Sequence, residues 1–395
     1  MQGSIIKENK YLSHNTLCLT HNCNLNCIYC YQKHSHDLSM SFETAQKTID
    51  FIFNNVSSKE MNVHIGFIGG EPLLEFSLIK EIFNYVQKKN IETPYYFFAS
   101  TNGTLLTNEM KKWFQERSKI FKLSLSLDGS KETHDFNRNN SFERIDIKYF
   151  LDTWPERRVK MTLSEYSLAN IARDIIYLHS LGIKRINGVN LFVGNIDWSK
   201  DEYIEILIPQ LEMLVEYYLE NKKFSNQLFD GKIGFCDIKP YERKKWCGIG
   251  ESIAFFDIDG KKYPCNFIAP MTFNKDEIKE VMKVDFTDNN AFIDEECYEK
   301  CYIYPICPTC YGENYLINKN LKIRNKSKCK FQKLIALYVA DLHLRRIIKN
   351  KDRISNDNNS LLFHTIEAIK GIRSNYFNEY KKYFVSINQK HMLNI

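Results

Sequence analysis

The sequence predicts an α/β protein built on a parallel sheet, followed by a cysteine-rich region. From Thr16 to about Phe224, short runs rich in β-branched and aromatic residues alternate with longer stretches of helical period. This alternation is typical of parallel strands joined by helices. Beyond Phe224 the periodicity fades, and eight of the 12 cysteines lie in that second part of the chain.

The predicted elements form six strand–helix units. The strands are expected at Thr16–Thr20, Val63–Ile68, Tyr95–Ser100, Lys122–Leu127, Val159–Leu163 and Val189–Val193. The amphipathic helices are expected at Ser41–Val56, Phe76–Lys89, Asn108–Ser118, Phe142–Thr153, Asn170–Leu181 and Asp201–Asn221. Six such units fit either an open doubly wound sheet or an incomplete barrel.

The residues at the strand ends favour the barrel. Barrel enzymes place their chemistry on loops at the C-terminal ends of the strands. Each of the first four predicted strands is followed by such residues, at Cys23–Cys30, Gly69–Glu71, Thr101–Gly103 and Asp128–Gly129. We therefore expect a partial (β/α)6 barrel.

Composition and charge exclude several classes of protein. The net charge of +6 over 395 residues is mild, and the basic residues are mixed with acidic ones, so nucleic acid is not indicated. Met1 to Asn15 lacks the apolar segment of a signal peptide, and no apolar run is long enough to span a membrane. We expect a cytoplasmic protein, in which clustered cysteines bind metal more often than they form disulfides.

Cys23, Cys27 and Cys30 lie on one loop and predict an iron–sulfur site. A [4Fe–4S] cluster normally takes four thiolates, so three would leave one iron open to a small molecule. The alternative is zinc, but structural zinc takes four ligands with C-x2-C pairs, and His21, His34 and His36 fall at no usual zinc spacing.

The spacing C-x3-C-x2-C, with Tyr29 before the last cysteine, resembles the motif of the radical S-adenosylmethionine (SAM) superfamily. The resemblance implies that SAM chelates the open iron and is cleaved to a 5′-deoxyadenosyl radical. Gly69-Gly70-Glu71-Pro72 resembles the GGEP motif of the same family, whose carbonyls would meet the SAM ammonium while Glu71 offsets its charge. The alternative for this motif is an ordinary Gly-Gly turn.

Further residues are assigned to SAM by the same resemblance. Ser126 would bind its ribose and Arg138 its carboxylate, for which a guanidinium fork is suited. Asn102 and the backbone around Leu163 would complete the nucleoside pocket. For Asp128 and His134, a capped turn and a core histidine are at least as good an interpretation as ligand contact.

The later cysteines resemble a SPASM domain, which binds two auxiliary [4Fe–4S] clusters. Its first half matches as Cys247, Gly260 and Cys265, whereas the second half reads C-x3-C-x5-C-x2-C with the family's outer spacings exchanged. The resemblance assigns Cys247, Cys265 and Cys310 to the first auxiliary cluster, with Cys236 as candidate fourth ligand or else a small buried residue. It assigns to the second auxiliary cluster Cys297, Cys301, Cys307 and Cys329.

These interpretations divide the chain into a radical SAM barrel (1–225), a SPASM domain (226–335) and a helical C-terminal extension (336–395). A turn at Asp259-Gly260 predicts a β-hairpin within Ile253–Tyr263. Cys18, inside the first predicted strand, is expected to be a small buried residue. In all, three [4Fe–4S] clusters and SAM are the expected cofactors.

Most relatives implied by the resemblance modify peptides or proteins. Anaerobic sulfatase-maturing enzymes place an aspartate base directly after the cysteine of the Gly-x4-Cys element, where this chain has Asn266. An amide cannot accept that proton, so we expect oxidative cross-linking of a ribosomal precursor peptide, through a carbon–carbon or thioether bond. The alternatives are sulfatase maturation, peptide epimerisation and a non-catalytic electron-transfer protein.

The expected partners follow from this chemistry. A flavodoxin or ferredoxin would supply electrons, and the peptide would be the substrate. Because the cluster motif begins at Cys23, we expect no N-terminal leader-binding domain. The leader would then be recognised by the barrel, by the C-terminal extension or by a separate protein.

Overall fold

The structure, a computed structural model, describes residues 12–34, 38–55, 62–191, 196–349 and 359–386. His36 lies outside these residues. The chain forms two compact units that are interleaved in sequence. The first unit comprises Met1–Leu127, His134–Lys160 and Cys247–Ala291. The second unit comprises Asp128–Thr133, Met161–Trp246 and Phe292–Ile395.

The first unit is built on a six-stranded sheet in the order β4-β3-β2-β1-β8-β9. Its first four strands are parallel and lie side by side in chain order: β1 (Leu12–Thr20), β2 (Asn62–Gly69), β3 (Tyr95–Thr101) and β4 (Phe121–Leu125). The later strand β8 (Ile253–Phe256) pairs with β1 in parallel, and β9 (Lys262–Tyr263) returns antiparallel to β8. The C-terminal ends of β1, β2, β3 and β8 therefore meet at one edge of the sheet.

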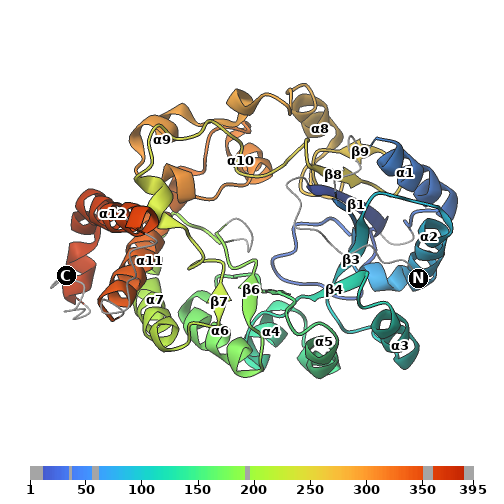
Figure 1. Cartoon of the computed structure of the whole chain (residues 1–395), viewed down its shortest axis with the longest axis horizontal. Helices are drawn as coiled ribbons and strands as arrows, with labels where there is room; N and C mark the ends of the chain where they lie inside the picture. Colours follow the sequence, from blue (N-terminus) through green and yellow to red (C-terminus); the bar gives the residue numbers. More distant parts are fainter. Residues whose placement is uncertain (1–11, 35–37, 56–61, 192–195, 350–358, 387–395) are drawn as a thin grey trace. The chain divides into compact units, whose positions relative to one another are not determined.

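Helices of the first unit follow the strands and begin at clear caps. These helices are α1 (Phe42–Asn54), α2 (Phe76–Lys88), α3 (Asn108–Glu116), α5 (Ile147–Thr153) and α8 (Lys275–Val281). The side chains of Ser41, Thr107 and Asp146 accept from backbone N–H groups in the first turns of α1, α3 and α5. In Figure 1, α1, α2 and α3 lie on the outer side of the parallel strands.

The core of the first unit lies between this sheet and its helices. Alternate residues of β3 and β4 are buried, as expected for strands with one covered face. The rings of Phe67, Phe97 and Phe121 come from three neighbouring strands, with centroids 5.6–5.9 Å apart, and all three are fully buried. This aromatic layer fixes the spacing of the strands whose ends carry the site.

The second unit is mainly helical. It contains α6 (Ile171–Ser180), α7 (Glu202–Glu220), α9 (Glu295–Lys300), α10 (Tyr311–Asn318), α11 (Cys329–Lys349) and α12 (Asn359–Ser386), and the short parallel pair β6 (Arg185–Asn187) and β7 (Ser225–Asn226). α11 and α12 lie side by side (Figure 1), with the buried rings of Tyr338 and Phe384 in contact. The prediction of a cysteine-rich region followed by a helical extension is confirmed.

Most predicted elements agree with the structure, but some are wrong. The last predicted strand, Val189–Val193, is not a strand in its described part, and β6 lies at Arg185–Asn187 instead. β5 (Val159–Lys160) is shorter than expected, and the Phe142–Thr153 helix divides into a 3-10 turn (Phe142–Arg144) and α5. α4 (Lys131–Asn137) and β7 were not predicted from the sequence.

The hairpin prediction is confirmed by β8 and β9, with Gly260 at a φ of +79° in the turn. The pairing of β8 with β1 was not predicted. Among the described residues, no helix combines the length and the apolar character needed to cross a membrane. The boundaries at residues 225 and 335 concern functional domains and stay a prediction.

Candidate active site

The loop after β1 carries Cys23, Cys27 and Cys30, which are partly or fully exposed and in no disulfide. The charges of Cys27 and Cys30 both bear on Cys23, and burial raises the pKa of Cys23 to about 11. His34 Nε2 lies 3.3 Å from Cys30 Sγ. Burial acts to raise the pKa of Cys30, but the contact with His34 and other neighbouring groups together hold the pKa below its ordinary value. The three thiols lie on one loop and act on one another electrostatically, and their binding of a common cluster stays a prediction.

Gly69 and Gly70 bring the end of β2 against this loop. The Gly70 N–H donates to Thr20 O at 3.0 Å, and the Glu71 N–H donates to Asn22 O at 2.9 Å. A Cβ on Gly69 would lie 2.3 Å from Thr20 O, and one on Gly70 would lie 2.2 Å from Asn22 O. The approach leaves no space for a side chain, so the motif is more than an ordinary turn.

Glu71 is almost fully buried and joins the ends of two strands. Its Oε1 accepts from the Leu73 N–H at 3.1 Å and from Thr101 Oγ1 at 2.8 Å. Its Oε2 accepts from the Asn102 N–H at 2.8 Å. Burial raises the pKa of Glu71 to about 7 despite these donors. The Glu71 carboxylate is therefore held by three hydrogen-bond donors of the protein. Its interaction with the SAM ammonium stays a prediction.

Asn102 links the end of β3 to the cysteine loop. Its Nδ2 donates to Asn24 Oδ1 at 2.9 Å, and its Oδ1 accepts from Thr104 Oγ1 at 2.7 Å. Asn24 in turn donates to Thr104 Oγ1 at 2.8 Å. Asn102 therefore lies at the predicted edge of the sheet, beside the residues between Cys23 and Cys27.

Arg138 and Tyr29 form the next part of the site. The guanidinium carbon of Arg138 lies 5.4 Å from the centroid of the Tyr29 ring, and both residues are buried. The Ile28 N–H donates to Asn137 O at 3.0 Å, which fixes the end of α4 against the cysteine loop. Arg138 therefore lies beside the cysteine loop, and its recognition of a SAM carboxylate stays a prediction.

The remaining SAM-binding candidates are distributed over both units. Ser126 is nearly buried in the first unit and donates its N–H to Thr101 O at 2.9 Å, whereas Leu163 is buried in the second unit. His134 contacts Ser141 Oγ at 3.0 Å, and Asp128 accepts from the Thr162 N–H at 2.9 Å. These last two contacts favour the structural interpretation of Asp128 and His134.

Asn266 lies beside the cysteine loop. Its Nδ2 donates to the hydroxyl of Tyr31 at 2.7 Å, and Tyr31 directly follows Cys30. The ring of Tyr31 stacks on Phe267 at 4.9 Å, and burial raises the pKa of Tyr31 to about 12. The position at which a sulfatase-maturing enzyme is expected to carry an aspartate is therefore occupied by an amide that contacts Tyr31, the residue after Cys30.

A cluster that the sequence analysis missed lies where β1 leads into the loop. His21 Nε2 is 2.7 Å from Asp257 Oδ1, and the ligand atoms of Cys18, His21 and Asp257 lie within 4.8 Å of one another. Cys18 is fully buried as predicted, and burial raises its pKa. Because Asp257 is 236 residues from His21, no local pattern could have shown this contact.

The second cysteine group lies within the second unit and lines one cavity. Cys297, Cys301, Cys307 and Cys329 all border a space of about 270 Å³. One water occupies roughly 30 Å³ in the liquid, so the cavity has room for much more than a single ion. Their charges bear on one another, and burial raises the pKa of Cys307 to about 12 and that of Cys297 to about 11.

This cavity fits the cofactor that the resemblance assigns to it. Four thiolates are the usual ligand set of a [4Fe–4S] cluster, and these four residues would hold it. Cys236 is fully buried. Burial is the main cause that raises its pKa to about 12, and the charges of Cys301 and Cys307 add to the shift. Cys247 and Cys265 belong to the first unit and Cys310 to the second, so the first auxiliary cluster stays a prediction.

Residues 17–207 match the family model described as the radical SAM superfamily. Together with the C-x3-C-x2-C loop and the GGEP contact, this match shows that residues 17–207 form a radical SAM domain. The radical SAM fold predicted from the sequence is confirmed.

Two relatives span most of the chain. The cysteine-type anaerobic sulfatase-maturating enzyme of Clostridium novyi is 26% identical over 326 residues, covering 72% of this chain and 84% of that protein. The antilisterial bacteriocin subtilosin biosynthesis protein AlbA of Bacillus subtilis is 26% identical over 343 residues, covering 81% of this chain and 71% of AlbA.

Two solved structures share the fold. Histidine-tagged anSMEcpe with bound AdoMet superposes with a TM-score of 0.64 and 20% identity, covering 90% of this chain and 98% of that one. Streptococcus suis SuiB bound to its precursor peptide SuiA gives a TM-score of 0.53 and 16% identity, covering 80% of this chain and 76% of that one. At these identities the likeness concerns the fold.

Proposed function

We propose that this protein is a peptide maturase that forms a cross-link between side chains of a ribosomal precursor peptide. A cluster on Cys23, Cys27 and Cys30 would supply an open iron for SAM and the electron that cleaves SAM to a 5′-deoxyadenosyl radical. Similarity to AlbA, named for bacteriocin biosynthesis, supports a peptide substrate. So does the fold shared with SuiB, which was solved with a precursor peptide.

The observation that carries this proposal is the position of Asn266. Its amide contacts Tyr31, which follows the third cluster cysteine, so Asn266 lies beside the loop that would generate the radical. An amide has no basic lone pair that could take the proton released in sulfatase maturation. Without that base, we propose that the substrate radical is instead captured by a second side chain.

The residues around the loop would bind and orient SAM. Gly69 and Gly70 let backbone carbonyls approach, since neither has a side chain and neither has space for one. Arg138 would pair with the SAM carboxylate, while Ser126 and Asn102 would contact its nucleoside. Because Arg138, Ser126 and Asn102 are all buried, the same residues exclude water from the radical.

The cross-link requires the loss of two hydrogens from the peptide. The deoxyadenosyl radical removes one hydrogen atom from a β-carbon and becomes 5′-deoxyadenosine. When the carbon radical bonds to the second side chain, the other hydrogen leaves as a proton and one electron. The cysteines of the 270 Å³ cavity would hold the cluster that accepts this electron.

The test is to incubate the reconstituted enzyme with SAM, reductant and the precursor peptide encoded beside it, in deuterated buffer. We expect a product lighter by two hydrogens, without deuterium at Cα, with one 5′-deoxyadenosine per cross-link. Tandem mass spectrometry should show no cleavage between the joined residues. A product of unchanged bond count with one deuteron would indicate an epimerase and contradict the proposal.

Sulfatase maturation needs a separate control, because oxidation of Ser or Cys to an aldehyde also removes two hydrogens. A hydrazide reagent will capture an aldehyde but not a cross-link. A captured product would contradict the proposal. The matched variant is Asn266→Asp, which introduces a carboxylate at this position and should not increase cross-linking.

A further inference from the structure

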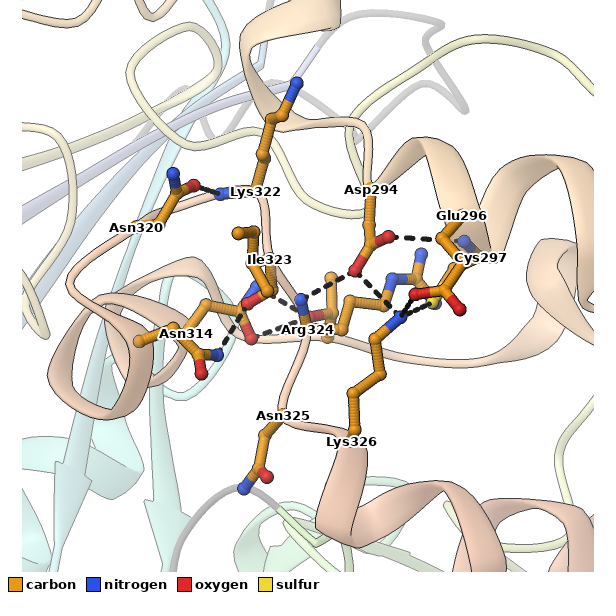
Figure 2. Close-up of polar contacts among 12 residues, drawn as sticks. Asp294, Glu296, Cys297, Asn314, Asn320, Lys322, Ile323, Arg324, Asn325 and Lys326 are labelled. Atoms are coloured by element: carbon orange, nitrogen blue, oxygen red, sulfur yellow. Dashed lines mark hydrogen bonds and ion pairs between the residues drawn. The ribbon is translucent and has the colours of Figure 1, made fainter.

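Lys326 lies against a cysteine of the cavity in the second unit. Its Nζ donates to Cys297 Sγ at 3.0 Å (Figure 2). Cys297 is buried on α9, and Lys326 begins the short 3-10 helix that leads to Cys329. The contact therefore joins the two parts of the chain that supply the first and last cysteines of this group.

Two carboxylates hold the ammonium in this position. Lys326 Nζ lies 3.3 Å from Asp294 Oδ2 and 3.2 Å from Glu296 Oε2. Asp294 is itself fixed, because it accepts from the Cys297 N–H at 3.2 Å and from the Arg324 N–H at 2.9 Å. Figure 2 shows the ammonium between these carboxylates and the sulfur. Asp294 is buried and fixed by these two N–H donors, whereas Glu296 is exposed, so Asp294 is the carboxylate that positions the ammonium.

A second cation reinforces the first. Arg324 Nη1 donates to Cys307 O at 3.0 Å, and its guanidinium lies 4.5 Å from the centroid of Tyr304. Two cationic side chains therefore lie beside the cysteine group.

We propose that Lys326 raises the reduction potential of the second auxiliary cluster by donating a charge-assisted N–H···S hydrogen bond to Cys297. This inference rests on the proposed function, which places that cluster on Cys297, Cys301, Cys307 and Cys329. Hydrogen bonds to the sulfurs and the local charge are among the factors that set such potentials. A cation at the ligand stabilises the reduced, more negative state.

The role suits the chemistry of cross-linking. Closure of the cross-link releases one electron and one proton, and the electron must go to an acceptor. A higher potential makes the cluster a better acceptor for that single electron. Lys326 touches neither substrate nor reacting atoms, so it is a positioning residue that acts through Cys297.

The test is an EPR-monitored potentiometric titration of the full chain carrying Cys23→Ala, Cys27→Ala and Cys30→Ala, which leaves the auxiliary clusters. In this background we expect Lys326→Met to lower one of two reduction steps and leave the other in place. The expected size is about a tenfold change in the reduced-to-oxidised ratio at fixed potential, or about 59 mV for one electron. Lys326→Arg should restore most of the shift.

Two further variants sharpen the result. Glu296→Gln removes a negative charge beside the ammonium and should shift the same step in the opposite direction. Lys322→Met removes a cation from the same loop, but Lys322 points away from Cys297 in Figure 2, so both steps should stay in place. An equal shift from Lys322→Met would mean that net charge alone is responsible and would overturn the proposal.

Iron and sulfide analysis separates the two possible failures. If the chain binds no cluster on Cys297, Cys301, Cys307 and Cys329, the proposed function is wrong at this point. If the cluster is present in Lys326→Met with unchanged potential, the inference fails and the proposed function stands. If Lys326→Met and Lys326→Arg both lose the cluster, Lys326 is needed for assembly, which also contradicts a role in setting the potential.

Discussion

The two cysteine groups of this protein are built in different ways. The loop at Cys23–Cys30 supplies three thiols and is fixed by backbone contacts, with Gly69 and Gly70 packed directly against it. The group at Cys297–Cys329 supplies four thiols around one cavity, and Lys326 donates a hydrogen bond to one of their sulfurs, Cys297 Sγ. Three ligands leave an iron open for SAM, whereas four close the cluster. Under the proposed function, the first site would therefore bind a ligand and the second would transfer electrons.

The strongest way to break this comparison is to remove the three-cysteine set. Replacing Cys23, Cys27 and Cys30 by Ala should abolish 5′-deoxyadenosine formation while leaving two of three clusters, because the auxiliary sites keep their own thiolates. Iron analysis and chromatography of the nucleoside measure both effects. A triple variant that still yields 5′-deoxyadenosine would contradict the assignment.

A smaller change should damage the first site alone. Gly70→Ala would bring a Cβ to 2.2 Å from Asn22 O and 2.7 Å from Cys23 Cβ, so the loop must move. A misplacement of about 1 Å in an active site can cost about 100-fold in rate. We expect a loss of about this size in the rate of SAM cleavage. Gly231→Ala is the control, since its Cβ would lie 3.9 Å from the nearest side chain. Equal activities of the two variants would show that the close approach is unimportant.

Arg138 tests how SAM is held at the open site. Arg138→Ala should weaken SAM binding about 10- to 100-fold, the range of a lost hydrogen bond to a charged group. Arg138→Lys should weaken it less, because a point charge remains but the fork is lost. Isothermal titration of the reconstituted enzyme with SAM measures both. Equal losses would mean that Arg138 does not bind the carboxylate.

Glu71 gives the smallest effect, in the pH dependence of stability. The folded protein raises the pKa of Glu71 from 4.5 to about 7, so between these pH values the native state binds more protons than the unfolded state. The contribution of Glu71 to the unfolding free energy therefore falls as the pH rises from about 4.5 to 7. Glu71→Gln should remove this dependence.

The measurement is the thermal midpoint of the anaerobic protein between pH 4.5 and 8. The advantage of the wild type over Glu71→Gln should shrink as the pH rises through this window. Glu81→Gln, at an exposed position, is the control and should follow the wild type. Parallel curves for wild type and Glu71→Gln would argue that Glu71 stays ionised throughout.

Local patterns were sufficient to predict most of the first unit. Each of β1 to β4 combines a strand pattern with a motif at its end, and the structure brings the motifs of β1, β2 and β3 into direct contact. Val189 and Leu191 gave a false strand because they are apolar and buried without belonging to one. The true strand, Arg185–Asn187, is too short to show a period.

The contacts that the sequence could not show join distant residues. β8 pairs with β1 although more than 200 residues separate the two strands, and this pairing brings Asp257 Oδ1 to 2.7 Å from His21 Nε2. Lys326 gave no sequence signal either, because a lysine among other polar residues looks like a solvated surface. The role proposed for Lys326 rests on the hydrogen bond to Cys297, which depends on the fold of the whole cysteine-rich region.

The most direct test of the difference between the two cysteine groups is the EPR spectrum of the reduced protein with and without SAM. We predict that SAM changes the signal of one cluster in the wild type, because one iron is open there. The auxiliary signals should stay unchanged, and SAM should have no effect on the variant lacking Cys23, Cys27 and Cys30. A SAM-dependent change that persists in that variant would contradict the account, since the open iron would then lie in the second group.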